Sequence, residues 1–127
     1  MTQEPPRSYL ATPSPVEGTH RFGHNAMAAP FEILIASEEV GYAGQAAAAA
    51  FEEVDRLERL FSKFIDNSDI TQINRLTPGN WTKVSADTIE CLKVAAKVNK
   101  ETFGAFDVTV GPLMAVWRNP DKSLRNP

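Results

Sequence analysis

The sequence predicts an α+β fold in which a small antiparallel sheet packs against two long helices. Two observations carry this prediction. An apolar run at residues 31–36 is typical of a strand that faces a hydrophobic core. Two longer segments, at about 42–64 and 86–103, repeat apolar residues at three- and four-residue steps, which is the spacing of an amphipathic helix.

The predicted strands begin with a hairpin. Residues 21–27 precede the apolar run and are predicted to pair with it through a turn near Ala29 and Pro30. A proline there fits a turn or an edge strand, because proline cannot donate a hydrogen bond inside a central strand. Two further short strands are predicted at 81–84 and 105–110.

The first long helix contains an alanine run, 46–50, of high helix propensity. Its acidic residues are expected on the water-facing side, where pairs four residues apart add only a few tenths of a kcal/mol each. The predicted buried stripe consists of Ala50, Val54, Leu57, Phe61 and Phe64, widened by Phe51 and Leu60. The acidic residues placed on the opposite side are Glu52, Glu53, Asp55 and Glu58.

Capping and turn signals divide the rest of the chain. Ser68 is predicted to be the N-cap of a short helix over 69–76, and the segment 77–80 is a turn signal. Ser85 is predicted to cap the second long helix, which Gly104 ends in a left-handed conformation.

Two features of the last predicted helices complete this description. The second long helix is expected to bury Ile89, Leu92, Ala96 and Phe103. A final helix over 112–117 is predicted to have Pro112 in its first turn.

Composition excludes several classes of protein. Thirteen basic and sixteen acidic residues give a net charge of -3, which argues against a nucleic-acid partner because binding phosphates needs a basic face. The sequence has no membrane segment, no secretory signal and no lipidation cysteine at its start, so we expect a cytoplasmic protein. Its single cysteine, Cys91, cannot form an internal disulfide and is expected to be buried and inert.

Two domain-level segments are predicted. Residues 1–18 hold four of the nine prolines and few apolar residues, so they are predicted to form a flexible tail. Residues 19–127 are predicted to form the folded part. Within it, His20 and His24 flank Gly23 and are expected to be structural histidines rather than a metal-binding pair.

Two segments have compositions of functional interest. Residues 102–113 combine two glycines, a proline and a carboxylate with apolar neighbours. Backbone N–H groups beside a carboxylate can bind the polar edge of a ligand, and Asp107 can accept hydrogen bonds from a sugar hydroxyl or an amino group. Residues 61–74, taken alone, are also explained by a helix end, a cap and a second helix.

Three short motifs follow one another along the chain. They are Ala26-Met27-Ala28; Ser62-x-Phe64 followed by Ser68-x-Ile70-x-x-Ile73-Asn74; and Thr102-x-Gly104-Ala105-Phe106-Asp107-x-Thr109-Val110-Gly111-Pro112-Leu113 followed by Trp117. In this order, over about residues 19–117, they resemble the motifs of the ApbE-like FAD:protein FMN transferases, although the family usually has Met-Gly-Thr where this chain has Met27-Ala28-Ala29. The resemblance implies that 19–127 is the N-terminal part of an ApbE-like flavin transferase domain, with the N-terminal half of that fold.

The resemblance also implies a function. Family members transfer FMN from the substrate FAD to a threonine or serine of a target flavoprotein, with Mg²⁺ as cofactor. The Mg²⁺ ligands are expected in the family's downstream half, so this chain is expected to be inactive alone, with no catalytic or metal residue of its own, and prone to self-association. The alternative is a non-enzymatic flavin-binding or protein-interaction module derived from the family, which should be monodisperse.

Six cofactor-binding residues follow from the resemblance. Met27 matches a position that contacts FAD. Phe64 matches an aromatic position, often tyrosine, beside the flavin or adenine, and Asn74 matches an asparagine at the pocket mouth. Ala105, Phe106 and Asp107 match a second triplet that contacts FAD.

Overall fold

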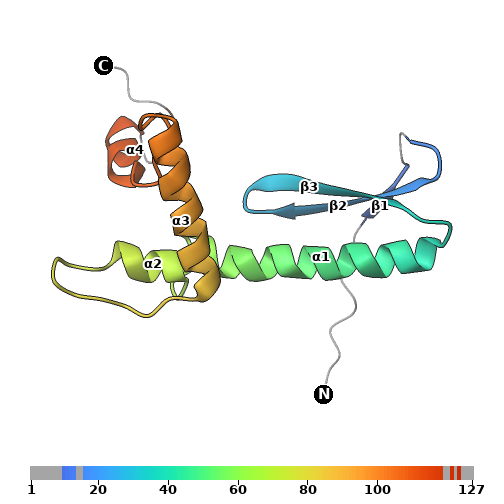
Figure 1. Cartoon of the computed structure of the whole chain (residues 1–127), viewed down its shortest axis with the longest axis horizontal. Coiled ribbons are helices and arrows are strands. Elements are labelled where there is room, and N and C mark those ends of the chain that lie inside the picture. The colour runs from blue at the N-terminus through green and yellow to red at the C-terminus, as the bar shows by residue number, and fades with distance from the viewer. Residues whose placement is uncertain (1–9, 14–15, 119–120, 122, 124–127) are drawn as a thin grey trace. The chain divides into compact units, whose positions relative to one another are not determined.

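The computed structural model describes residues 10–13, 16–118, 121 and 123. They belong to two compact units, 1–83 and 84–127, which we call the first and second units. The first unit contains β1 (Leu10–Thr12), β2 (Thr19–Ala26), β3 (Ala29–Ala36), α1 (Val40–Phe61) and α2 (Asp69–Asn74) (Figure 1). The second unit contains α3 (Ala86–Glu101) and α4 (Gly111–Trp117). The predicted α+β class is confirmed.

The sheet of the first unit is antiparallel, with the strand order β1-β2-β3. β2 and β3 pair along their whole length, so the hairpin prediction is confirmed. The turn contains Met27 and Ala28 and therefore lies just before the predicted Ala29–Pro30. Pro30 lies inside β3, which is an edge strand, as its missing N–H donor requires.

β1 is a strand that the sequence pattern did not predict. Its three residues, 10–12, pair with β2 although they lie in the segment predicted as a tail. The parts of the tail prediction that concern residues 1–9 and 14–15 lie outside the described residues.

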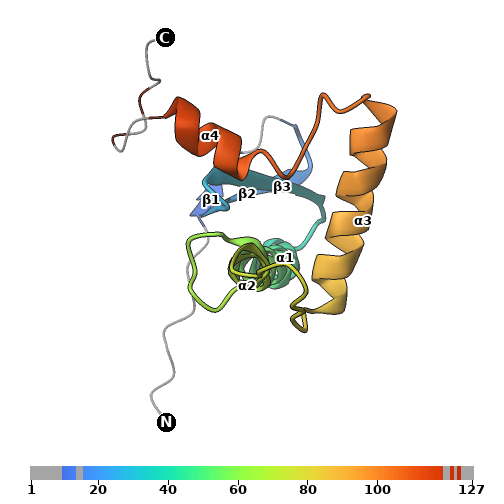
Figure 2. The same ribbon diagram turned by 90° about the vertical axis from the view of Figure 1, so that its left-hand side faces the viewer.

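α1 lies along one face of the sheet (Figures 1 and 2). Because side chains alternate across a strand, every second residue of β2 and β3 faces the helix. The core consists of Phe22, Ala43, Ala47 and Phe51, with Phe31, Ile33 and Ile35 packed against it. Burying these apolar side chains holds the sheet on the helix.

The buried stripe predicted for the first long helix is confirmed at Phe51, which is fully buried, but its other members are only partly buried or exposed. α1 buries Ala43, Ala47, Phe51 and Asp55, which are spaced by four residues. Ala50 is exposed, and Phe64 lies beyond the end of the helix with 81% of its surface exposed. A run of five alanines covers the whole circumference of a helix, so the run itself does not indicate which side is buried.

The prediction that all the acidic residues of this helix face water is wrong for Asp55. It is buried, and its Oδ1 lies 2.6 Å from Nε2 of His24. The His24 ring also packs against Phe51, with 5.1 Å between the ring centroids. Nε2 of His20 lies 2.9 Å from the carbonyl oxygen of Ser37, so both histidines have structural partners, as predicted.

The segment after α1 follows its sequence signals in part. The Ser68 side chain caps α2, which ends two residues before the predicted limit of 76. The turn at 77–80 is confirmed by a bond of 3.0 Å from the Asn80 N–H to the Thr77 carbonyl. The strand predicted at 81–84 is wrong, because these residues pair with no strand among the described residues.

The second unit begins as predicted. Ser85 caps α3 by accepting a hydrogen bond from the Thr88 N–H, and α3 ends at Glu101. Gly104 has the predicted left-handed conformation, with φ of 84°, and donates to the Asn99 carbonyl at 2.8 Å. Pro112 lies in the first turn of α4, which confirms the last predicted helix.

Other predictions for the second unit are wrong. Residues 105–110 form a loop with a bend and a turn rather than a strand. α3 buries Thr88 and Ala95 instead of the predicted stripe, and Phe103 is fully exposed because its φ of 52° places it past the helix end. Cys91 is exposed rather than buried.

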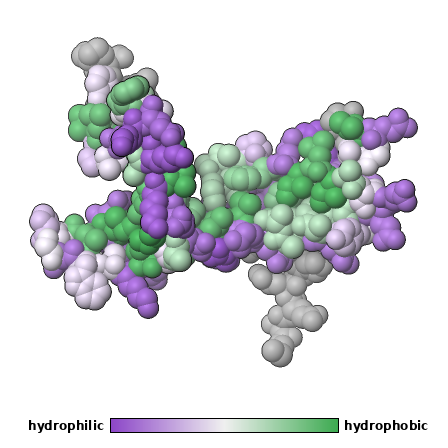
Figure 3. Space-filling view, in the orientation of Figure 1, coloured by the Kyte–Doolittle hydropathy of each residue, from purple (hydrophilic) through white to green (hydrophobic). Residues whose placement is uncertain are grey.

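Hydrophobic side chains also reach the surface of each unit. Figure 3 shows hydrophobic patches over the strands and over α4. In the first unit, Trp81 and Phe64 are among the most exposed large side chains, and in the second unit Val116 is 63% exposed. None of the described helices is both long enough and apolar enough to span a membrane.

Candidate functional site

A hollow of about 300 Å³ lies in the first unit between the β2–β3 turn and the C-terminal end of α1. It brings together residues from two of the three motifs, because Met27 comes from one and Phe64 from another. Its lining consists of Met27, Ala28, Glu58, Phe61, Ser62, Lys63 and Phe64. We call it the turn hollow.

The β2–β3 turn has an unusual backbone conformation. Met27 and Ala28 have φ values of 51° and 56°, so both lie in the left-handed region. A two-residue hairpin loop with positive φ at both positions is a type I′ turn, which ordinarily contains Asn or Gly. The side chain of Glu58 accepts a hydrogen bond of 2.8 Å from the Met27 N–H and thereby attaches the turn to α1.

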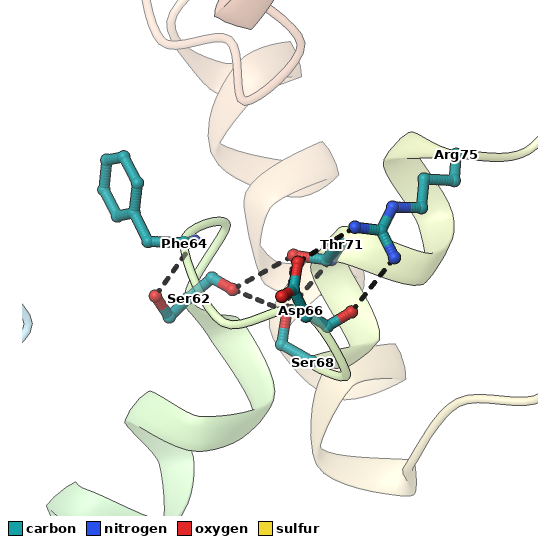
Figure 4. Close-up of polar contacts among 6 residues, drawn as sticks. All are labelled: Ser62, Phe64, Asp66, Ser68, Thr71 and Arg75. Carbon is teal, nitrogen blue, oxygen red and sulfur yellow. Dashed lines mark hydrogen bonds and ion pairs between the residues drawn. The ribbon is translucent and has the colours of Figure 1, made fainter.

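Phe64 lies in the connection between α1 and α2, which a group of hydroxyl side chains orders (Figure 4). Ser68, with only 1% of its surface exposed, donates to the Ser62 carbonyl at 2.5 Å and accepts from the Thr71 N–H at 3.0 Å. The Ser62 hydroxyl accepts a bond of 3.2 Å from the Phe64 N–H. These contacts fix the backbone of Phe64, while its ring points away from the polar group (Figure 4).

Lys63 places a positive charge beside the aromatic ring. Its Nζ lies 5.1 Å from the centre of the Phe64 ring, within the range of a cation–π contact. Asp66 and Arg75 form a further ion pair of 3.0 Å across the same connection. Both of its side chains are exposed, so this pair contributes little to stability.

Asn74 is the last residue of α2 and is exposed. It belongs to the same unit as Met27 and Phe64 but is not among the residues that line the turn hollow. The other three predicted site residues, 105–107, lie in the loop between α3 and α4 of the second unit.

Asp107 closes a local turn in that loop. Its Oδ1 accepts a hydrogen bond of 2.7 Å from the Thr109 hydroxyl and one of 2.8 Å from the Thr109 N–H. The hydroxyl bond, followed by the backbone bond, lowers the pKa of Asp107 below its ordinary value. Asp107 is therefore a carboxylate at neutral pH.

Phe106 is held by the last turn of α3. The Asn99 side chain donates to the Phe106 carbonyl at 2.7 Å, and the Thr102 hydroxyl accepts from the Phe106 N–H at 3.1 Å. The Phe106 side chain is 45% exposed, so the fixed backbone presents an accessible ring.

Four residues with these supporting contacts were missed as site residues in the sequence. Glu58 appeared to be a water-facing acid on a helix, and nothing in the sequence showed which side chain would reach the turn. For Asn99 and Thr109, an amide or a hydroxyl at a short spacing from the motif residue was the available signal, and for Lys63 it was a positive charge directly before Phe64. The residues are Glu58, Lys63, Asn99 and Thr109.

The residues of the turn hollow offer surfaces and groups that can bind a ligand. The turn hollow offers aromatic and thioether surface with one carboxylate and one ammonium group. Among the described residues, no group of three or more His, Cys, Asp or Glu side chains is arranged to hold a metal ion.

Comparison with known proteins identifies the family. The model of the ApbE family matches residues 27–127. The chain belongs to the ApbE family. The matched region contains every predicted site residue, from Met27 to Asp107.

Individual relatives support this assignment over shorter regions. The chain is 36% identical over 69 residues to the FAD:protein FMN transferase of Vibrio cholerae, which covers 51% of the chain and 21% of the relative. It is 39% identical over 57 residues to the enzyme of Haemophilus influenzae, and this match covers 44% of the chain and 16% of the relative. It is 29% identical over 65 residues to the enzyme of Buchnera aphidicola, and this match covers 51% of the chain and 19% of the relative. The chain therefore spans about a fifth of the length of these relatives.

Proposed function

We propose that the protein carrying this chain transfers FMN from FAD to a threonine or serine of a target flavoprotein in a Mg²⁺-dependent reaction. The chain would supply part of the FAD-binding site. The supporting observation is that Met27 and Phe64, from separate motifs, line the same hollow. The similarity of the chain to FAD:protein FMN transferases gives further support.

The turn hollow suits a flat ring system. Aromatic side chains and methionine sulfur make favourable contacts with the faces and edges of such rings. A volume of about 300 Å³ lies at the lower end of the usual range for ligand pockets. We therefore assign one ring system of FAD, rather than the whole dinucleotide, to this hollow.

The remaining predicted contacts are polar or lie in the second unit. The Asn74 amide has both donors and acceptors, and the ionised Asp107 accepts hydrogen bonds from a ribose hydroxyl or an amino group. We propose that Ala105 and Phe106 contact FAD beside Asp107. The bonds from Asn99 and Thr102 to Phe106 would keep this part of the loop in place.

The Mg²⁺ ion would neutralise charge on the phosphates of FAD during transfer. The described residues do not offer a set of ligands for it, so we place its ligands elsewhere in the protein. In this proposal the chain's own residues bind and orient FAD, and the chain alone releases no AMP.

The test is FAD binding by the full 127-residue chain, followed by flavin fluorescence. Phe64→Ala should weaken FAD binding roughly fivefold, because it removes an aromatic stacking contact. Tyr42→Ala is the matched control, since this aromatic residue is 66% exposed on α1 and does not line the hollow. Equal effects of the two substitutions, or no FAD binding by the unsubstituted chain, would contradict the proposal.

A second measurement distinguishes a transferase from a non-enzymatic flavin-binding module. The full-length protein should release AMP from FAD and label a target flavoprotein when Mg²⁺ is present. FAD binding without AMP release by the full-length protein would instead indicate the flavin-binding module. Sedimentation of the chain tests the predicted self-association, which the module would not show.

A further inference from the structure

Glu58 occupies a distinctive place on α1. It lines the turn hollow and also the neighbouring depression formed by residues of the β2–β3 turn, so its side chain lies between the helix and the turn. Its Oε1 accepts a hydrogen bond of 2.8 Å from the backbone N–H of Met27. A hydrogen bond with an ionised acceptor is stronger than a bond between neutral groups.

The turn that Glu58 contacts has a conformation that its residues rarely adopt. Met27 and Ala28 both carry a Cβ atom, yet both have positive φ values of 51° and 56°. Such conformations cost free energy and persist where the surrounding structure determines them. The contacts that the structure shows at the turn therefore matter for its shape.

The neighbouring carboxylate of Asp55 makes a different contact with the same hairpin. Asp55 lies three residues before Glu58 and faces the same hairpin, but it contacts the His24 side chain in the body of β2. Asp55 therefore holds the strand, whereas Glu58 holds the turn itself. The two carboxylates lie on one side of the helix because residues three apart are neighbours on a helix surface.

We propose that Glu58 is a positioning residue of the candidate site. Its carboxylate holds the Met27 N–H and so keeps the turn in the left-handed conformation that places Met27 and Ala28 along the hollow. The effect of Glu58 on ligand binding rests on the proposed function. Its effect on the shape of the turn is independent of that function.

The experiment compares four variants of the full chain by two measurements. The first measurement is hydrogen exchange of the Met27 amide, followed by NMR, and the second is FAD affinity, followed by flavin fluorescence. Glu58→Ala removes the acceptor, and Glu58→Gln keeps one. Glu53→Ala is the matched control, because Glu53 is exposed on the same helix and pairs with Arg56.

The decisive variant combines Glu58→Ala with Ala28→Gly. Glycine adopts positive φ at no steric cost, so the turn should keep its shape without the carboxylate. If Glu58 acts through the turn, this second substitution restores the FAD affinity that Glu58→Ala loses. If Glu58 instead contacts the ligand directly, Ala28→Gly does not restore the FAD affinity.

We expect Glu58→Ala to speed exchange of the Met27 amide and to weaken FAD binding about tenfold. Glu58→Gln and Glu53→Ala should stay within roughly threefold of the unsubstituted chain in FAD affinity. The double variant should regain an FAD affinity within the same threefold range.

Two results would overturn the proposal. Unchanged exchange of the Met27 amide in Glu58→Ala would show that the carboxylate does not hold the turn. Failure of Ala28→Gly to restore FAD affinity would show that Glu58 acts on the ligand rather than through Met27. A chain that binds no FAD would contradict the proposed function, and the exchange measurement would then decide the role of Glu58 at the turn.

Discussion

At the scale of single residues, small polar groups hold the candidate ligand contacts in place. Glu58 holds the Met27 N–H and Ser62 holds the Phe64 N–H, so for these two residues the side chain that would meet the ligand is distinct from the group that is held. Asp107 is instead held through its own carboxylate, which accepts two bonds from Thr109. Substitutions at the supporting residues should therefore change the geometry of the site without removing a direct contact.

Thr109→Val tests this for Asp107. The substitution keeps the side-chain shape but removes the hydroxyl that contributes most to lowering the pKa of Asp107. We expect the pKa of Asp107 to rise toward its ordinary value of 3.8, while the bond from the backbone N–H keeps part of the effect. An NMR titration of the Asp107 carboxyl carbon measures the change, and an unchanged pKa would contradict the role assigned to the hydroxyl.

The direction of the pH dependence follows from the same shift. Because the folded-state pKa of Asp107 is lowered, its ionised form stabilises the local turn above its ordinary pKa of 3.8. This stabilisation is lost as the pH falls through the lower folded-state value. The 107–109 turn should therefore be fully formed at neutral pH and should loosen only in strong acid.

The resemblance to a family selected Met27 and Phe64, which line the hollow, but neither the other lining residues nor the contacts that hold the turn. Met27 and Phe64 could be selected because their neighbours form recognisable motifs. Glu58 could not be selected, because an acidic residue on a helix is usually exposed and its partner is a backbone group. Contacts of this kind depend on where the hairpin meets α1, which only the folded chain defines.

At the scale of elements, local signals predicted the caps and turns better than the buried faces. Ser68, Ser85 and Gly104 act where the sequence indicated, because capping depends on a few neighbouring residues. The predictions of strands at 81–84 and 105–110 are wrong because a strand needs a partner strand, and the described residues provide none for these two segments. The stripe predicted for α1 is fully buried only at Phe51, because the apolar residues of the helix are not confined to one side.

The two serine caps provide a matched pair of substitutions. Both accept a hydrogen bond from the third helical N–H, but Ser68 also donates to the Ser62 carbonyl and is almost fully buried. We expect Ser68→Ala to cost about 2 kcal/mol of local stability in α2 and Ser85→Ala about 1 kcal/mol in α3. Native-state hydrogen exchange of each helix measures both values, and each variant is the control for the other helix. Equal costs would show that the Ser62 contact adds nothing.

At the scale of the whole molecule, the chain consists of two compact units joined by an exposed segment. Residues 77–81 and Lys83 are exposed and lie outside any helix or strand, next to the boundary between the units. The family model extends across this boundary and covers most of the chain. Family membership therefore concerns both units, even though the turn hollow belongs to the first.

Limited proteolysis tests the exposure of the joining segment. Trypsin should cut after Lys83 before it cuts after Lys93 or Lys97, because a helix must open locally before a protease can bind it. Mass spectrometry of the fragments over time identifies the first cut, and Lys83→Gln should abolish it. An earlier cut within α3 would contradict the assignment of Lys83 as the more accessible site.

The two-residue length of the β2–β3 turn also limits how this chain can change by insertion or deletion. Side chains alternate along a strand, so one residue added between Met27 and Ala28 would reverse the side to which each β3 residue points unless a bulge absorbed it. Phe31, Ile33 and Ile35 would then leave the core and face water. The turn can exchange one side chain for another, but its number of residues is tied to the packing of the whole first unit.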